Sequence, residues 1–170
     1  MGTVFSAWRQ ALRAWLWFLV SLSVLMGVLV WARPFTDSKL TAWLASASAM
    51  LLRMAGIEAT VHGTTLNTSV GALEIVRECT GVYPMALYIA AVLAVPTSWS
   101  RKLLGIGLGF VAIQLANIVR IISLLFFRRW WPEAFETVHL VVWQSLMVFW
   151  IVLFWILWAT AIAGKQRRVA

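Results

Sequence analysis

Residues 103–127 read LLGIGLGFVAIQLANIVRIISLLFF, and this stretch decides the fold class. Its 25 residues are uncharged except for Arg120. About 20 such residues in helical conformation cross the hydrocarbon core of a bilayer, whereas a surface helix of a soluble domain carries one polar face. The stretch therefore predicts a transmembrane helix.

Three further uncharged runs lie on either side of this stretch. They contain 19, 22 and 28 residues and lie at Ala14–Ala32, Cys79–Ser100 and Thr137–Gly164. We therefore predict an all-α membrane protein with a single domain, residues 1–170. Its four transmembrane helices are predicted at about 14–32, 80–97, 103–127 and 137–163. The first run exceeds the apolar core of about 7–15 residues in a secretory signal peptide, which predicts a retained helix, with cleavage as the alternative.

The composition supports the same class. Hydrophobic residues make up 62% of the chain and charged residues only 12%, with a mean hydropathy of +0.88. A soluble domain carries about 25% charged residues. The composition thus excludes a disordered chain, a coiled coil and a nucleic-acid-binding domain, although the net charge is +8.

The basic residues predict the orientation of the helices. If the N-terminus is cytoplasmic, the cytoplasmic segments carry no acidic residue and seven basic ones: Arg9, Arg13, Arg101, Lys102, Lys165, Arg167 and Arg168. The outer segments then carry six basic residues and all six acidic ones. Because Lys and Arg near helix ends favour the cytoplasmic side, we predict that both termini are cytoplasmic. The basic residues would lie against anionic membrane lipid.

The predicted outer loop, residues 33–78, is the only long segment between transmembrane helices. Residues 40–52 have helical periodicity but are too short to cross a bilayer, which predicts an amphipathic helix on the outer leaflet. Its apolar face would consist of Leu40, Trp43, Leu44, Ala47, Leu51 and Met54. If this helix crossed the membrane instead, every later segment would change sides. Apolar and polar residues then alternate from Ile57 to Ile75, which predicts a small β-hairpin or three-stranded meander.

Arg120 is the charged residue within the run 103–127. A charge in mid-span costs about 2.5–3.5 kcal/mol on insertion scales, and a guanidinium does not lose its proton to avoid that cost. Gln114, Asn117 and Arg120 recur every three residues, which predicts one polar stripe facing the other helices. Two structural alternatives are that Arg120 snorkels to the outer headgroups or clamps backbone carbonyls.

Cys79 is the only cysteine, which excludes an intrachain disulfide and dithiol chemistry. It begins the second apolar run, where a helix N-terminus would lower the pKa of its thiol if a cation offsets Glu78. The alternative is an inert buried thiol. His139 begins the fourth run, and its side chain titrates near neutral pH, as a catalytic base would. The alternative is a polar residue at the level of the lipid headgroups.

Counted along the predicted helices, Cys79, Arg120 and His139 lie in one shallow layer below the outer leaflet. A nucleophile, a base and a fixed cation are the groups that acyl transfer from a peptide bond requires. His139 would take the thiol proton, Cys79 would attack the carbonyl and Arg120 would stabilise the oxyanion. Tyr83, one turn after Cys79, is predicted to be an interfacial aromatic residue or, alternatively, part of a substrate pocket.

Three pieces of sequence surround these positions: GALEIVRECTG at 71–81, NIVR at 117–120 and FETVH at 135–139. Together they resemble the exosortase/archaeosortase family, in which Cys-[Ser/Thr]-Gly, Asn-x-x-Arg and a single His form a specific set. The resemblance runs from about Val61 to the end of the fourth run. The chain is most similar to the short exosortase H type, since one transmembrane helix precedes the hairpin where many members have several more.

The resemblance implies a membrane-embedded cysteine transpeptidase in the bacterial inner membrane, with a periplasmic active site and neither cofactor nor metal. Such enzymes are taken to recognise a C-terminal sorting signal of exported proteins, made of a short motif, one transmembrane helix and a basic tail. They cut this signal and transfer the new carboxyl end to an acceptor, which the resemblance leaves unspecified. In this reading Asn117 orients Arg120. The implied residues are catalytic Cys79, Arg120 and His139 and supporting Asn117, Thr80 and Gly81.

A non-enzymatic assembly or binding module is the alternative from another functional class. Gln114, Asn117 and Arg120 would then bind a partner's transmembrane helix, and Cys79 would be inert. A transporter is a third alternative, but four helices with one buried cation leave little room for alternating access. Replacing Cys79 by alanine would be tolerated by a binding module and not by a transpeptidase.

Overall fold

The computed structural model describes the backbone of residues 2–167 and the side chains of residues 8–161. Three helices are long and apolar enough to cross a membrane, and they lie within α1 (Gly2–Met54), in α3 (Trp99–Trp130) and in Pro132–Ala161, which includes most of α5 (Trp143–Arg167). The helical membrane class is therefore confirmed. The run Cys79–Ser100 forms a shorter apolar helix, α2 (Val82–Ala94), of only 13 residues.

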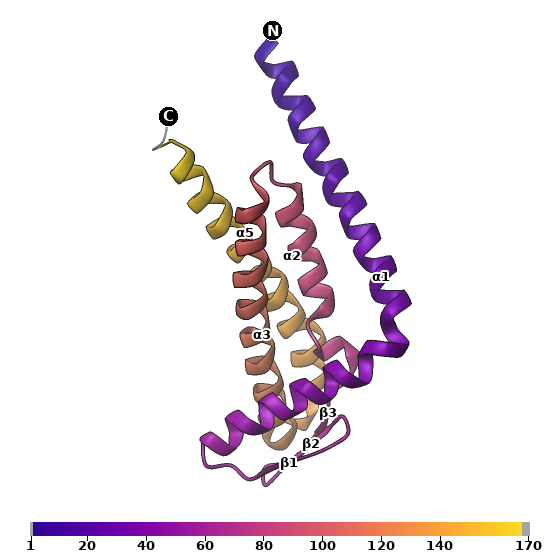
Figure 1. Ribbon diagram of the computed structural model, residues 1–170. Coiled ribbons are helices and arrows are strands. Elements are labelled where there is room, and N and C mark those ends of the chain that lie inside the picture. The colour runs from indigo at the N-terminus through magenta and orange to yellow at the C-terminus, as the bar shows by residue number, and fades with distance from the viewer. Residues whose placement is uncertain (1, 168–170) are drawn as a thin grey trace.

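α1 joins two segments that the sequence predicted as separate. It continues through Pro34, and Figure 1 shows that it bends sharply and then crosses beneath the other helices. Proline inside a helix removes one backbone hydrogen bond and its ring displaces the preceding turn, so the helix bends there. We call residues 8–33 the first arm and residues 35–54 the second arm. The predicted amphipathic helix 40–52 is thus part of the second arm and not an independent element.

The second arm packs one face on protein and leaves much of the predicted apolar face exposed. Trp43, Leu51 and Met54 of that face are exposed, which is compatible with contact to lipid, whereas Leu44 of the same face is buried. The buried residues are Thr41, Leu44, Ala45, Ser48, Ala49 and Leu52. Small side chains let the arm pack closely on the sheet and on α3, with Leu44 and Leu52 as the large apolar residues at this contact. Apolar periodicity predicted the helix, but it does not distinguish a face packed on protein from a face that can contact lipid.

A three-stranded antiparallel meander follows, as predicted. Its strands are β1 (Ala59–His62), β2 (Thr65–Thr68) and β3 (Ala72–Glu74), in the order β1-β2-β3. Leu66 pairs with both Val61 and Leu73, so one apolar row crosses the sheet. This row packs on the second arm of α1 and leads into the buried Ile75.

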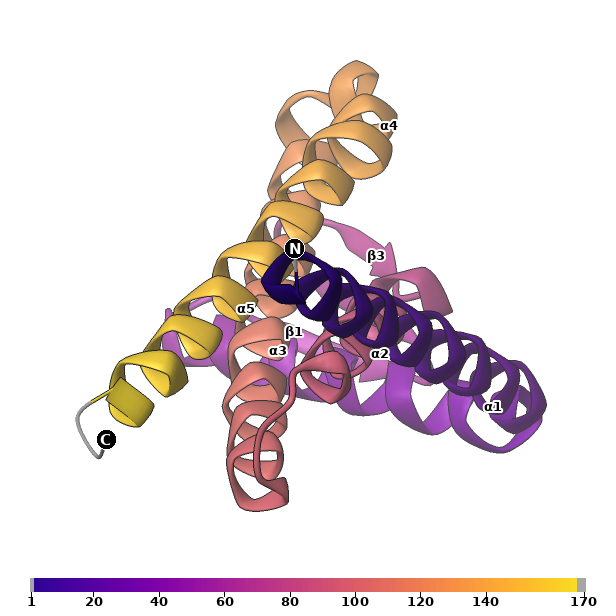
Figure 2. The same ribbon diagram turned by 90° about the horizontal axis from the view of Figure 1, so that it is seen from above.

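α2, α3 and α5 pack together, and the first arm of α1 lies beside α2 on the side away from α5 (Figures 1 and 2). Two glycines of α3 permit this packing, because an added Cβ would lie 2.3 Å from Trp158 at Gly105 and 2.0 Å from Tyr88 at Gly109. The helices therefore approach closely at these two positions. At Gly107 an added Cβ would meet nothing within 4 Å.

The start of α1, the loop between α2 and α3 and the end of α5 lie at one end of the molecule, and the sheet lies at the other (Figure 1). The predicted cytoplasmic residues Arg9, Arg13, Arg101 and Lys102 therefore share one end. The side chains of Lys165, Arg167 and Arg168 lie outside the described residues. Between α3 and α5 the chain passes through η2 (Pro132–Ala134), α4 (Phe135–Thr137) and the π-helical turn η3 (Val138–Val142).

Candidate active site

Cys79 ends a short 3-10 turn, η1 (Arg77–Cys79), just before α2. The turn is closed by its own backbone, since Cys79 N donates to Val76 O at 2.9 Å. Thr80 adds two bonds to the Arg77 carbonyl, from its backbone N at 2.9 Å and from Oγ1 at 2.6 Å. Gly81 then adopts φ +74°, a left-handed conformation that favours glycine, and lets the chain enter α2. The Thr-Gly pair after the cysteine thus has a defined structural purpose.

The polar stripe of α3 holds this turn from the other side. Asn117 is fully buried, and its Nδ2 donates to the Cys79 carbonyl at 2.6 Å. Gln114 Nε2 donates to the Thr80 carbonyl at 3.3 Å. The stripe therefore faces the protein, as predicted. We expected Asn117 to orient Arg120. Its amide nitrogen instead binds the backbone of the turn that carries Cys79.

His139 approaches the thiol from the π-helical turn η3. Its Nε2 lies 3.7 Å from Cys79 Sγ, within hydrogen-bond range for sulfur. The ring lies beside Phe135, with 5.7 Å between the ring centroids. A π-helical turn widens the helix by one residue and commonly occurs at functional sites, where it redirects a side chain. The structure thus brings together a thiol and an imidazole that are 60 residues apart in sequence.

Arg120 lies on the same stripe and is only 2% exposed. Its Nε is buried and has no hydrogen-bond partner among the described residues. The snorkelling alternative is therefore wrong, since the side chain stays inside the protein. Its charge acts on the Cys79 thiol, which places the three predicted catalytic residues in one electrostatic neighbourhood.

The thiol itself differs from the sequence-based expectation. Burial raises the pKa of Cys79, and the nearby Glu78 carboxylate raises it further. The Arg120 charge and a backbone hydrogen bond at Val76 lower the pKa but do not offset burial. Desolvation disfavours the charged form of a thiol, so burial here favours the neutral side chain. This direction is opposite to that of the predicted thiolate, and a nucleophilic reaction of a neutral thiol requires a base to remove the proton.

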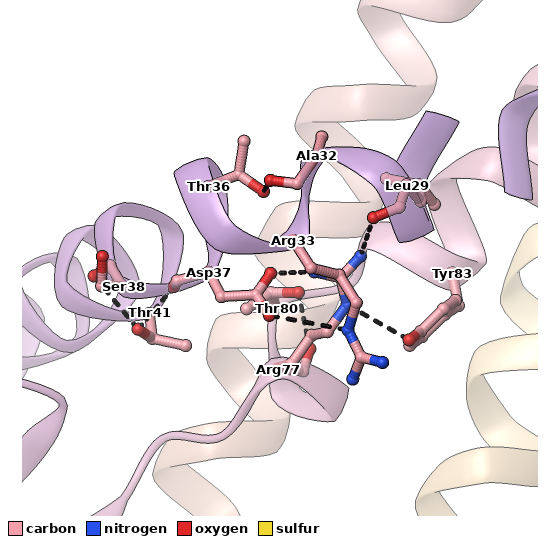
Figure 3. Close-up of polar contacts among 10 residues, drawn as sticks. All are labelled: Leu29, Ala32, Arg33, Thr36, Asp37, Ser38, Thr41, Arg77, Thr80 and Tyr83. Carbon is pink, nitrogen blue, oxygen red and sulfur yellow. Dashed lines mark hydrogen bonds and ion pairs between the residues drawn. The ribbon is translucent and has the colours of Figure 1, made fainter. Parts of the chain in front are cut away.

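Sequence reasoning missed Arg77 and Asp37, which it counted only as outer charges. Arg77 is 7% exposed, and its guanidinium is shared by three acceptors (Figure 3). Nε donates to Tyr83 Oη at 3.1 Å, Nη2 donates to the Leu29 carbonyl at 2.8 Å and Nη1 pairs with Asp37. Tyr83 is therefore a partner of Arg77. Pro34 was the available signal, because a bent helix exposes carbonyls that an arginine can satisfy.

The fold and the buried polar layer define a multi-pass helical membrane protein with a Cys-His-Arg cluster at one end. The family model described as transmembrane exosortase (Exosortase_EpsH) matches residues 1–158. The chain belongs to this family, which confirms the family prediction, and the match includes α1 as well as the segment after Val61. Comparisons with curated proteins and with solved structures give no match. The assignment to the short H type stays a prediction.

Proposed function

We propose that this chain is a cysteine transpeptidase that cleaves a C-terminal sorting signal of exported proteins and transfers the new carboxyl end to an acceptor. The observation that carries the proposal is the 3.7 Å approach of His139 Nε2 to Cys79 Sγ, next to a buried guanidinium whose Nε has no partner among the described residues. Membership of the exosortase family supports the same reaction class. Asn117, Thr80 and Gly81 support the reaction by fixing the turn that carries the thiol.

Because burial favours the neutral thiol, the first step needs a base. His139 removes the thiol proton as Sγ attacks the carbonyl carbon of the scissile peptide bond. No thiolate forms beforehand, and the negative charge develops on the carbonyl oxygen. Arg120 donates to this oxyanion in a site that excludes most water. The C–N bond then breaks, and His139 returns the proton to the leaving amine. The product is a thioester on Cys79.

The second half of the reaction reverses the order of these steps. A nucleophilic group of the acceptor gives its proton to His139 and attacks the thioester carbon, again with the oxyanion against Arg120. The C–S bond breaks, the thiol regains a proton from His139, and the new acyl bond joins substrate to acceptor. If water is the nucleophile, the same residues release a free carboxylate, so the site also supports peptidase activity.

The proposal includes a topology of four crossings in a bacterial inner membrane, with both termini cytoplasmic. α2 would be the short crossing, extended by the residues between α2 and α3. The sheet end of the molecule would be periplasmic, which brings the Cys79 layer to the leaflet where exported substrates arrive. The substrates would carry a short motif, one transmembrane helix and a basic tail.

This topology is tested by labelling one introduced cysteine. Ser69 is exposed beyond the end of β2, so Ser69→Cys in a Cys79→Ala background offers a single reactive thiol. A membrane-impermeant maleimide applied to spheroplasts should label it, while Ser100→Cys at the opposite end should react only after the membrane is opened. The reverse pattern would overturn the proposed orientation.

A binding module for a partner's transmembrane helix is the second candidate, and one observation favours it. Burial raises the pKa of Cys79, as expected for an inert thiol. The two candidates differ in what they require of the sulfur atom. A transpeptidase needs a nucleophile at this position, whereas a binding module needs only a small side chain.

The deciding experiment compares the unmodified chain with Cys79→Ala and Cys79→Ser in cells. Mass spectrometry of exported proteins reads whether C-terminal segments with a motif, an apolar helix and a basic tail have been removed. The proposal expects both variants to accumulate uncut precursors at normal levels of the membrane protein. Normal processing in either variant would overturn the transpeptidase and support the binding module.

A further inference from the structure

The bend of α1 lies beside the turn that carries the nucleophile. Pro34 has no backbone N–H, so the helix loses one hydrogen bond at this place and the two arms of α1 separate in direction (Figure 1). Leu29 precedes the bend and Asp37 follows it. A group that binds both residues therefore determines how the bend sits against the rest of the protein.

Arg77 is that group. Its guanidinium donates to the Leu29 carbonyl at 2.8 Å on one side of the bend and pairs with the Asp37 carboxylate on the other (Figure 3). Nε donates to Tyr83 Oη at 3.1 Å, and the guanidinium carbon lies 5.5 Å from the centre of the Tyr83 ring. One buried side chain thus joins both arms of α1 to the first turn of α2. A planar guanidinium holds its N–H groups in a rigid fork, so these three contacts fix direction as well as distance.

The backbone of Arg77 passes this constraint to the thiol. Arg77 begins η1 and Cys79 ends it, so no flexible segment separates the guanidinium from the nucleophile. The Arg77 carbonyl accepts both hydrogen bonds from Thr80, which closes the turn around Cys79. Asn117 holds the same turn from α3 through the Cys79 carbonyl. The position of Sγ is therefore set by two anchors, one on α3 and one on the bend of α1.

The charge of Arg77 does not act on the reaction directly. The side-chain charges that shift the pKa of Cys79 are those of Arg120 and Glu78. The positive charge of Arg77 is paired with Asp37, which Arg33 also approaches at 3.8 Å from the exposed side. The contribution of Arg77 to the site is consequently geometric.

From these contacts we infer that Arg77 and Asp37 are positioning residues for the nucleophile, which use the bend of α1 to hold Cys79 Sγ opposite His139. The inference rests on the proposed function, since it assigns these residues to the Cys79–His139 pair. It makes the first membrane helix part of the active-site framework. A displacement of about 1 Å between reacting groups is enough to lower a rate by about 100-fold.

The experiment measures alkylation of Cys79 by iodoacetamide in the purified full chain, where no other cysteine competes. The measured quantity is the alkylation rate of each protein divided by the rate of the same protein with His139→Ala added, across a pH series. This ratio reports whether the imidazole reaches the thiol. We expect a ratio of about tenfold or more in the unmodified chain, as befits base assistance. In Asp37→Asn and in Arg77→Lys it should fall to about one, since Lys cannot reproduce the fork.

Two controls separate positioning from general disruption. Asp37→Glu keeps the carboxylate and should retain most of the ratio. Arg33→Gln removes a neighbouring charge on the same helix and should leave the ratio unchanged, because exposed ion pairs contribute little. Thermal unfolding of each variant verifies that the protein is folded when it is alkylated. If Asp37→Asn does not accumulate, Tyr83→Phe removes one acceptor of the same guanidinium and should reduce the ratio partially.

A folded Asp37→Asn protein that keeps the full ratio would overturn the inference. If Asp37→Asn does not accumulate, an unchanged ratio in Tyr83→Phe would overturn it instead. A ratio near one in the unmodified chain would count against the inference and against the Cys79–His139 pair of the proposed function. The two ideas also fail separately. Substrate processing by Cys79→Ala contradicts the proposed function alone, whereas the alkylation ratio requires no substrate.

Discussion

Arg77 and Arg120 are both buried arginines, and the first lies in the turn that carries Cys79 whereas the second lies on α3. The Arg77 guanidinium has a carboxylate, a carbonyl and a hydroxyl as partners, whereas Arg120 has a buried Nε without one among the described residues. A buried guanidinium whose donors are satisfied stabilises the structure that satisfies them. A buried guanidinium whose donors lack partners costs free energy. Such a residue is expected where an incoming group supplies the missing hydrogen-bond acceptors. Under the proposed function, the comparison separates a residue that builds the site from one that would serve the reaction.

The largest effect is expected from Arg120→Lys. The ammonium keeps the charge but cannot present two parallel N–H groups to an oxyanion, so processing should fall by about 100-fold or more. The protein should still insert and accumulate, because no protein acceptor of the Nε donor is lost. The measurement is the rate at which sorting signals disappear after a pulse of substrate synthesis. Processing at a normal rate would place Arg120 with Arg77 among the structural residues.

The comparison is sharpened by measuring stability in Arg77→Met and Arg120→Met. Removing one partner of a fully buried ion pair costs about 3–5 kcal/mol, and because Asp37 is 33% exposed we expect about 2 kcal/mol for Arg77→Met. Arg120→Met removes a buried charge that has no ion-pair partner among the described residues and should leave the free energy of unfolding unchanged or raise it. Reversible unfolding in mixed micelles measures both values. Equal losses in the two variants would contradict the distinction.

A smaller effect is expected from Asn117→Ala. This change removes the hydrogen bond to the Cys79 carbonyl and leaves the Arg77 anchor in place, so the turn keeps one of its two supports. Processing should fall by about tenfold, in line with about 1–2 kcal/mol for a buried hydrogen bond. Thr65→Ala, on the sheet and away from the stripe, provides a control of similar chemistry. A loss as large as that of Arg120→Lys would show that Asn117 does more than hold the backbone.

The smallest effect concerns the thiol in the absence of substrate. Because burial holds the pKa of Cys79 above its usual range, alkylation should rise with pH at higher values than for a free cysteine. Arg120 lowers that pKa, so Arg120→Gln should shift the profile further upward and slow alkylation at pH 8 by a few-fold. Arg77→Gln should not shift the midpoint through its charge. A profile midpoint below that of free cysteine would restore the thiolate that the sequence predicted.

Apolar runs and three polar residues were enough to predict much of this arrangement. The run 103–127 could only be a membrane helix, and the shared depth of Cys79, Arg120 and His139 predicted the contact between the thiol and the imidazole. Depth along a helix follows from counting residues, because the rise per residue is fixed. The catalytic roles of these residues remain a proposal.

The remaining features depend on information that a linear pattern lacks. The bend at Pro34 merged two predicted segments, and the buried face of the second arm could not be chosen because protein and lipid are both apolar partners. The pair of Arg77 and Asp37 joins residues 40 positions apart, for which periodicity gives no indication. The direction of the shift in the Cys79 pKa could not be predicted, because it depends on how deeply the thiol is buried. The extent of burial decides whether desolvation or the charge of Arg120 has the larger effect.

The π-helical turn Val138–Val142 carries one residue more than the surrounding α-helix needs. Deleting a single residue there, such as Leu140, should restore regular α-helical register and remove the bulge that turns His139 toward Cys79. α5 could keep its packing on α2 and α3, while His139 would point away from the sulfur. A one-codon deletion would thus keep the helical bundle and separate the imidazole from the thiol. The contact between His139 and Cys79 is in this sense a separable insertion in a helix that otherwise spans and packs.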